Sequence, residues 1–132
     1  MYKESAMNKY LSNIILNVKG LNAPIKRHRI AEWIRKHDPH ICCLQETHLR
    51  TKDLHRLKVK GWKQIFQANR QEKKAVVAIL ISDKIDFQRR AIKRDPEGHF
   101  IILKGKNPPR RHKHCKYIYT QHRSIQIHKE NL

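Results

Sequence analysis

Acidic residues are scarce in this chain. The 132 residues contain 11 Asp and Glu against 30 Lys and Arg, which gives a formal net charge of +19 at neutral pH. An excess of this size favours a polyanion as the partner. Nucleic acid ranks ahead of an anionic membrane surface, because no basic amphipathic helix with a wide apolar face is evident. The alternative is a basic, soluble protein without a dedicated polyanion site.

Long apolar runs and cysteines are also few. No stretch approaches the length of a transmembrane helix, and residues 1–9 contain no apolar signal core. The cysteines are Cys42, Cys43 and Cys115, and the adjacent pair would point to opposite faces of a strand, which is no disulfide framework. We therefore expect no membrane partner and an intracellular location, nuclear or cytoplasmic.

A short apolar stretch near residue 41 ends on a carboxylate. Ile41 to Leu44 has the length of a buried strand, and Gln45 and Glu46 follow directly. In open α/β sheets the chemistry takes place just beyond the carboxyl ends of such strands, so Glu46 is the first candidate functional residue. The competing interpretation is an ordinary solvated carboxylate at a strand end.

The preceding residues predict a strand and a helix. Residues 11–18 include three consecutive apolar residues, which suits a strand buried on both faces. A helix is predicted from the N-cap Asn22, with Pro24 in its first turn, to about His37, and Pro39 stops it.

Strand, helix and strand at this spacing form a crossover unit whose two strands can lie parallel. Asn17 and Glu46 then come to the same edge of the sheet. A carboxylate beside an amide suits a hard cation such as Mg²⁺, which prefers oxygen ligands and keeps several waters.

The rest of the chain divides at residue 106. Further strands are predicted over residues 61–68, 75–81, 85–93 and 99–104, with a polar loop that includes a turn of helix over residues 50–60. We expect a flexible N-terminus over residues 1–10, one domain over residues 11–106 and a basic, disordered tail over residues 107–132. The tail histidines match no tight ligand pair of the finger type, which argues against a zinc site.

Several blocks of this sequence resemble one known domain. They are residues 16–22 (Leu-Asn-Val-Lys-Gly-Leu-Asn), 25–29 (Ile-Lys-Arg-His-Arg), 43–49 (Cys-Leu-Gln-Glu-Thr-His-Leu), 55–58, 60–62 and 77–80. The blocks resemble the N-terminal half of the endonuclease domain of mammalian long interspersed element (LINE-type) retrotransposons. That domain belongs to the endonuclease/exonuclease/phosphatase superfamily, with apurinic endonucleases and exonuclease III. The resemblance is dense from about Leu11 to Gly105.

The resemblance implies a fold and a reaction. The fold is a four-layer α/β sandwich of two packed mixed sheets with helices outside. The reaction is metal-assisted hydrolysis of a DNA phosphodiester, in which Mg²⁺ polarises phosphoryl oxygens. The resemblance assigns the metal-binding Glu to Glu46 and the first catalytic-site Asn to Asn17. It assigns no individual nucleic-acid-binding residue.

The chain departs from the family pattern in its second half. A Gly-Asp-Phe-Asn block and a Ser-Asp-His block are absent from these 132 residues, and Ser82-Asp83 is followed by Lys84. The family's Gly before the 77–80 block is Val76 here, and a second Asn is Lys19. We expect an incomplete four-layer sandwich with one apolar sheet face uncovered and open to self-association. The pattern predicts a truncated copy whose tail is read from a shifted frame or from foreign sequence.

Three functions remain open. The first is a nuclease-related fragment that keeps the metal ligand Glu46 but is inactive, because the Asp and His blocks are absent. The second is a non-catalytic basic module that binds DNA or RNA through non-specific phosphate contacts. The third is a non-functional relic. A DNA-nicking assay with Mg²⁺ separates the first from the second.

Overall fold

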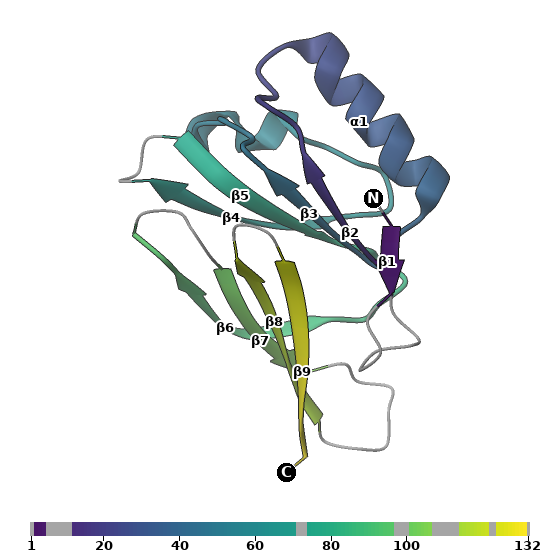
Figure 1. Ribbon diagram of the computed structural model, residues 1–132, viewed down its shortest axis with the longest axis vertical. Helices are drawn as coiled ribbons and strands as arrows, with labels where there is room; N and C mark the ends of the chain where they lie inside the picture. The colour runs from purple at the N-terminus through teal and green to yellow at the C-terminus, as the bar shows by residue number, and fades with distance from the viewer. Residues whose placement is uncertain are drawn as a thin grey trace.

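The computed structural model describes residues 2–4, 12–70, 74–96, 101–106, 114–121 and 124–131. In these residues two β-sheets face each other, and one long helix covers the outer side of the first sheet (Figure 1). This is the predicted mixed α/β architecture. The helix and the two sheets form three layers of a four-layer sandwich.

The predicted crossover unit opens the first sheet. Strand β2 (Ser12–Asn17) leads through helix α1 (Pro24–His37) to strand β3 (Ile41–Gln45). β2 and β3 pair in parallel, as predicted, with Asn17 opposite Gln45. A short strand, β1 (Tyr2–Glu4), pairs antiparallel with β2 inside the segment that was expected to be flexible, and so covers the free edge of β2.

Helix α1 begins and ends close to the predicted positions. Pro24 occupies the first turn, but Ala23 is the N-cap in place of Asn22, and no side chain caps the helix. At the other end Asp38 adopts a left-handed conformation (φ 50°), and its N–H donates to the carbonyl of Ile34 at 2.8 Å. In the part of the chain that the structure describes, no helix is both long and apolar enough to cross a membrane.

The other strands of the first sheet follow β3. A 3₁₀ helix, η2 (Thr51–Arg56), lies in the loop that was predicted to contain a turn of helix. Strands β4 (Gln64–Arg70) and β5 (Lys74–Ile81) then form a hairpin. The sheet order is β1-β2-β3-β5-β4, so β5 lies between two partners, as its apolar sequence predicts.

The second sheet contains four antiparallel strands in chain order. They are β6 (Gln88–Arg94), β7 (Ile101–Lys106), β8 (His114–Gln121) and β9 (Ser124–Asn131). β6 and β7 correspond to the two strands predicted over residues 85–104.

β8 and β9 differ from the expectation of a disordered tail. That expectation gave weight to charge and to the Pro108-Pro109 break, whereas antiparallel pairing with β7 supplies backbone partners whatever the side chains are. The remaining tail residues, 107–113, 122–123 and 132, lie outside the described residues.

An apolar core fills the space between the two sheets. It joins side chains of the first sheet to side chains of β7 and of the segment before β6. Its buried members are Ile41, Cys43, Ala68, Val77, Ile79, Ile81, Ile85, Phe87, Ile101 and Leu103. The prediction of an uncovered sheet face was therefore wrong, because Ile85, Phe87, Ile101 and Leu103 pack against that face. Self-association was expected because of that uncovered face, so the structure removes the basis for this expectation.

A second apolar core lies between the first sheet and α1. Ala31 and Ile34 of the helix pack there with Cys42, Leu44 and Leu80. Cys42 and Cys43 thus point into different cores, as predicted for adjacent residues of a strand. Burial, reinforced by the neighbouring Cys43, raises the pKa of the Cys42 thiol far above its ordinary value. Cys42 is therefore a small apolar side chain with little thiolate character.

Candidate metal and phosphate site

Two strand ends meet at one edge of the first sheet. Asn17 is the last residue of β2, and Glu46 directly follows β3. The parallel backbone pairing continues past both strands. The N–H of Val18 donates to the carbonyl of Gln45 at 3.0 Å, and the N–H of Gly20 donates to the carbonyl of Glu46 at 2.6 Å. This pairing holds the two loops against each other and brings the predicted residues Asn17 and Glu46 together.

The side chains of Asn17 and Glu46 are in direct contact. The Nδ2 group of Asn17 donates to Oε2 of Glu46. Oδ1 of Asn17 accepts a hydrogen bond from the backbone N–H of Lys19 at 3.1 Å. The amide oxygen is therefore occupied by the backbone, and the amide nitrogen faces the carboxylate. In this arrangement Asn17 positions Glu46 and is not itself placed as an oxygen ligand.

The loop after β3 has an unusual backbone. Glu46 and His48 have φ values of 56° and 57°, and Lys19 in the facing loop has a φ of 49°. Left-handed conformations of non-glycine residues cost on the order of 1 kcal/mol or more and concentrate at functional sites. The buried side chains of Thr47 and Leu49 anchor the loop, whereas His48 is exposed and Glu46 half-buried. The loop thus presents a carboxylate and an imidazole at the sheet edge.

His48 is held by the loop that leads into α1. Asn22 was predicted to cap the helix, but its Nδ2 group donates to the carbonyl of His48 at 3.4 Å. The ring of His48 lies over Gly20, where a Cβ atom would be 3.8 Å from Cδ2. Gly20 has a φ of +92°, so the turn that carries this contact favours glycine.

Cations of the first turn of α1 fold back onto the same loop. Nζ of Lys26 donates to the carbonyl of Lys19 at 3.1 Å. Nη1 of Arg27 donates to the carbonyl of Leu21 at 2.9 Å and to that of Asn22 at 2.7 Å. The first turn holds no acidic residue. The cations therefore contact the loop that pairs with the backbone of Glu46, and their positive charge attracts a phosphate group.

One carboxylate is the smallest set of protein ligands with which Mg²⁺ is usually bound. Within the described part of the chain, no cluster of three or more His, Cys, Asp or Glu side chains forms a metal cage. Mg²⁺ is commonly held by one or two carboxylates together with water and phosphate oxygens. Glu46 thus suits Mg²⁺ as a direct ligand, and the nearby cations suit the phosphate that would complete the coordination.

The sequence reasoning found the two strand-end residues and missed the cations around them. A signal for the cations was present, because Lys26 and Arg27 stand in the first turn of a helix, where the helix dipole disfavours positive charge. Such a placement indicates that the charges serve something other than helix stability. The contact of Lys26 with Lys19 depends on the loop conformation and has no local sequence signature.

Comparisons with known proteins identify the family and the fold. The model of the endonuclease/exonuclease/phosphatase family matches residues 14–126. The structure of D. rerio TDP2 complexed with a single-strand DNA product has a TM-score of 0.61 and 17% identity, covering 85% of this chain and 45% of that one. Truncated Caenorhabditis elegans TDP2 has a TM-score of 0.54 and 20% identity, with coverages of 75% and 42%.

The AP endonuclease LMAP from Leishmania major is also similar. Its TM-score is 0.52 at 18% identity, and the match covers 72% of this chain and 35% of that one. At such identities the likeness shows the fold alone, and this chain spans less than half the length of each of the three structures. The family match includes Asn17 and Glu46 and extends past the boundary predicted at residue 106, which stays a prediction. The chain belongs to the endonuclease/exonuclease/phosphatase family.

Proposed function

We propose that these 132 residues bind nucleic-acid phosphate at the edge formed by Asn17 and Glu46, with weakly held Mg²⁺, and do not hydrolyse it by themselves. The observation that carries this proposal is the contact of Asn17 with Glu46 at adjacent parallel strand ends, beside the cations of the first turn of α1. The sequence blocks further support an origin in a LINE-type retrotransposon endonuclease and an intracellular location, nuclear or cytoplasmic.

Each residue of the site has a distinct role in this proposal. Glu46 would hold the ion, which when bound polarises a phosphoryl oxygen. Asn17 orients the carboxylate by donating to Oε2. Lys26 and Arg27 supply positive charge for the phosphate, and the exposed His48 lies within the same loop pair. These roles describe binding and orientation of a phosphodiester.

Hydrolysis requires more than binding. A water must be placed in line with the phosphorus, and a group must accept its proton. A His–carboxylate pair with close geometry is His28–Glu32 at 2.9 Å, but it lies on the exposed surface of α1, away from the strand ends. General acid–base help contributes about a hundred- to ten-thousand-fold in rate, so activity without it is expected near background.

A binding experiment with and without Mg²⁺ tests the proposal. The affinity of the chain for a short DNA duplex is measured by fluorescence anisotropy, alongside Glu46→Gln and the control Glu32→Gln. Both substitutions remove one negative charge, but Glu32 lies on the exposed surface of α1 and pairs with His28. Mg²⁺ should strengthen binding by wild type and Glu32→Gln more than binding by Glu46→Gln. An equal Mg²⁺ effect in all three proteins would remove Glu46 as the metal ligand.

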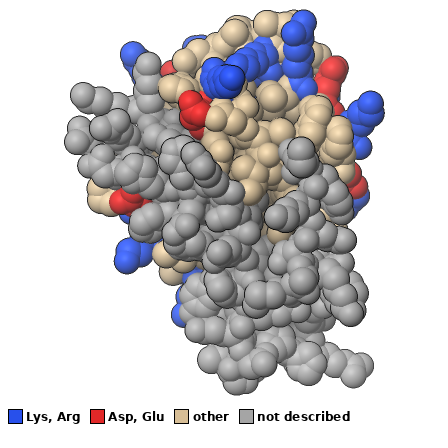
Figure 2. All heavy atoms as spheres, viewed as in Figure 1, with Lys and Arg blue, Asp and Glu red and all other residues tan. Residues whose placement is uncertain are grey.

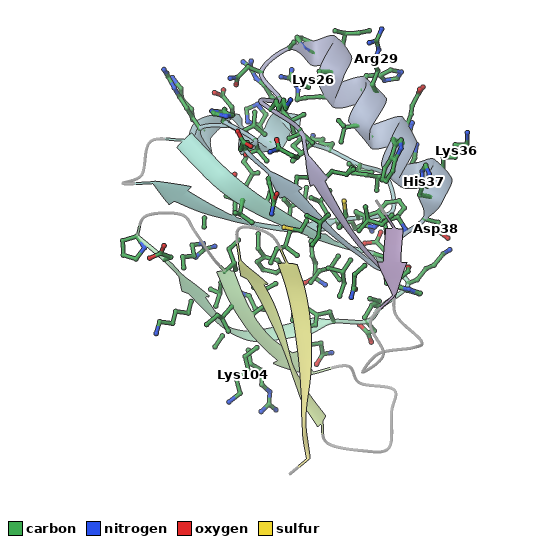
Figure 3. All side chains as sticks on the ribbon, in the orientation of Figure 1. Lys26, Arg29, Lys36, His37, Asp38 and Lys104 are labelled. Atoms are coloured by element: carbon green, nitrogen blue, oxygen red, sulfur yellow. The ribbon has the colours of Figure 1, made fainter. Side chains whose placement is uncertain are left out.

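The second candidate is a basic nucleic-acid-binding module without a metal. The distribution of charge favours it, since Lys and Arg gather over α1 at one end of the molecule (Figure 2). Lys26 and Arg29 lie at that end and Lys104 lies on the second sheet at the other (Figure 3). Binding of this kind loses affinity steeply as salt rises and prefers no sequence, for DNA or RNA. A steep salt dependence with no Mg²⁺ effect would select this module, and absence of binding would select a relic.

A further inference from the structure

A second surface feature lies at the far end of α1 from the candidate site. A groove of about 880 Å³ runs between the C-terminal turn of α1, η2, the loop over residues 57–63 and the start of β4. On α1, Arg35 of the groove and Lys26 of the site lie roughly 14 Å apart along the axis, at about 1.5 Å per residue. We call this feature the rear groove.

The floor of the rear groove is apolar and rigid. Leu57, Val59 and Trp62 line it, and each also belongs to the core beneath α1 with at most 4% of its surface exposed. Nε1 of Trp62 donates to the carbonyl of Pro39 at 2.9 Å, which fixes the indole ring. Leu54 and Ile65 are half-buried, so they offer the apolar surface of the floor that a ligand can cover. The groove is therefore already formed in the unbound protein.

The rim of the rear groove is basic. Arg35, Lys58, Lys60 and Lys63 are exposed and line it, and the described residues that line it include no Asp or Glu. Basic side chains arranged around an apolar floor are complementary to a ligand that carries carboxylates beside apolar side chains.

A nucleic-acid strand matches this groove less well than a peptide does. Bases bind single-strand platforms by stacking on exposed aromatic rings, but the ring of Trp62 is 4% exposed and held by its hydrogen bond. Phosphate groups would meet the lysines and leave the apolar floor unfilled. An amphipathic peptide fills the floor with apolar side chains and places acidic ones against the rim.

We propose that the rear groove docks an acidic, amphipathic peptide segment of a protein partner. The docking uses none of the residues that form the phosphate site. The groove thus allows the chain to hold a protein and a nucleic acid at the same time.

Fluorescence anisotropy of the full chain with three labelled probes tests the docking. The first probe is a peptide with Glu and Leu in an amphipathic helical pattern. The second has the same composition with that pattern scrambled, and the third is a single-stranded oligonucleotide of equal charge. The amphipathic peptide should bind at least about tenfold more tightly than the scrambled one. Equal binding of the two peptides would overturn the proposal, because charge alone would then explain it.

Two pairs of substitutions locate the binding. Lys58→Glu with Lys60→Glu reverses the rim, and Arg90→Glu with Lys93→Glu makes the same change in net charge on the exposed surface of β6. The affinity for the amphipathic peptide should fall about tenfold or more in the rim variant, whereas the β6 variant should bind the peptide as wild type does. Equal losses in both variants would overturn the groove as the site.

A floor substitution separates a peptide from a nucleic acid. Leu54 is half-buried, and Leu54→Ala should weaken binding of the amphipathic peptide while binding of the oligonucleotide stays unchanged. Thermal melting checks that each variant is folded. If the oligonucleotide displaces the peptide and depends on Lys58 and Lys60 in the same way, the rear groove is a nucleic-acid surface and the proposal fails.

Discussion

Strands β3 and β6 illustrate how differently the two sheets are built. Every residue of β3 is buried, because the strand lies between two partners and beneath apolar layers on both faces. In β6 all residues except Ile92 are exposed, and β7 is its partner within the sheet. Burial on both faces contributes most of the apolar stabilisation available to a strand. The first sheet should therefore carry most of the stability of the described fold.

The largest expected effect is a core truncation in the first sheet. Leu44→Ala removes a fully buried side chain of β3 and should lower the free energy of unfolding by about 2–5 kcal/mol. Ile92→Ala, at the half-buried position of β6, should cost about 1 kcal/mol. Urea denaturation of both variants measures the difference. Equal losses would show that the second sheet contributes as much stability as the first.

A smaller effect should be confined to the second sheet. A Cβ at Gly105 would lie 2.5 Å from the ring of Phe87 and 2.5 Å from the carbonyl oxygen of Gln88. Gly105→Ala should therefore destabilise the packing of β7 by about 1–3 kcal/mol. Hydrogen exchange should become faster in β6 and β7, while β3 and β5 keep their protection. Equal acceleration in β3 would mean that the two sheets open as one unit.

These contrasts also explain which parts of the fold the sequence predicted. Strands β3 and β5 each lie between two partners in the sheet, and the unbroken apolar runs over residues 41–44 and 75–81 are their signature. Residues 114–121 pair with β7 and contain the stretch Tyr-Ile-Tyr-Thr, whose aromatic and β-branched residues favour a strand. The expectation of a disordered tail gave this local signal less weight than the surrounding charge. The contact of Gly105 with Phe87 joins residues far apart in the chain and has no local signal.

The candidate site shows the same limit. Asn17 and Glu46 were predicted because parallel strands bring their carboxyl ends to one edge, and topology alone decides that. The hydrogen bond from Lys19 to Asn17, and hence the positioning role of the amide, follows from the left-handed turn at Lys19. A lysine in the sequence does not indicate such a conformation, since few non-glycine residues adopt it.

The stability of the first sheet should depend on pH because the thiol of Cys42 is buried in it. Burial raises the pKa of the Cys42 thiol, so the folded state keeps the proton that the unfolded state releases above about pH 8.5. The stability linked to this proton is complete below that pH and is lost as pH rises. Cys42→Val places an apolar side chain without a thiol at the same buried position, so its free energy of unfolding in urea should decline less between pH 8 and pH 10 than that of wild type. Identical declines would assign the pH dependence to other groups.

The smallest expected effect concerns chemistry, where the first sheet again differs from the second. The first sheet brings Asn17 and Glu46 together, but the described residues place no carboxylate-oriented His beside them. The loop that leads into α1 holds the backbone of His48, but the ring is exposed, and catalysis requires a side chain that its surroundings hold tightly. One carboxylate leaves most Mg²⁺ positions to water, and no described residue is fixed by a carboxylate as an acceptor for the proton of an in-line nucleophile. Wild type should therefore nick supercoiled plasmid in Mg²⁺ no faster than Glu46→Ala. Clear nicking that disappears in Glu46→Ala would mean that the rest of the active site is supplied from elsewhere, such as a second copy of this chain.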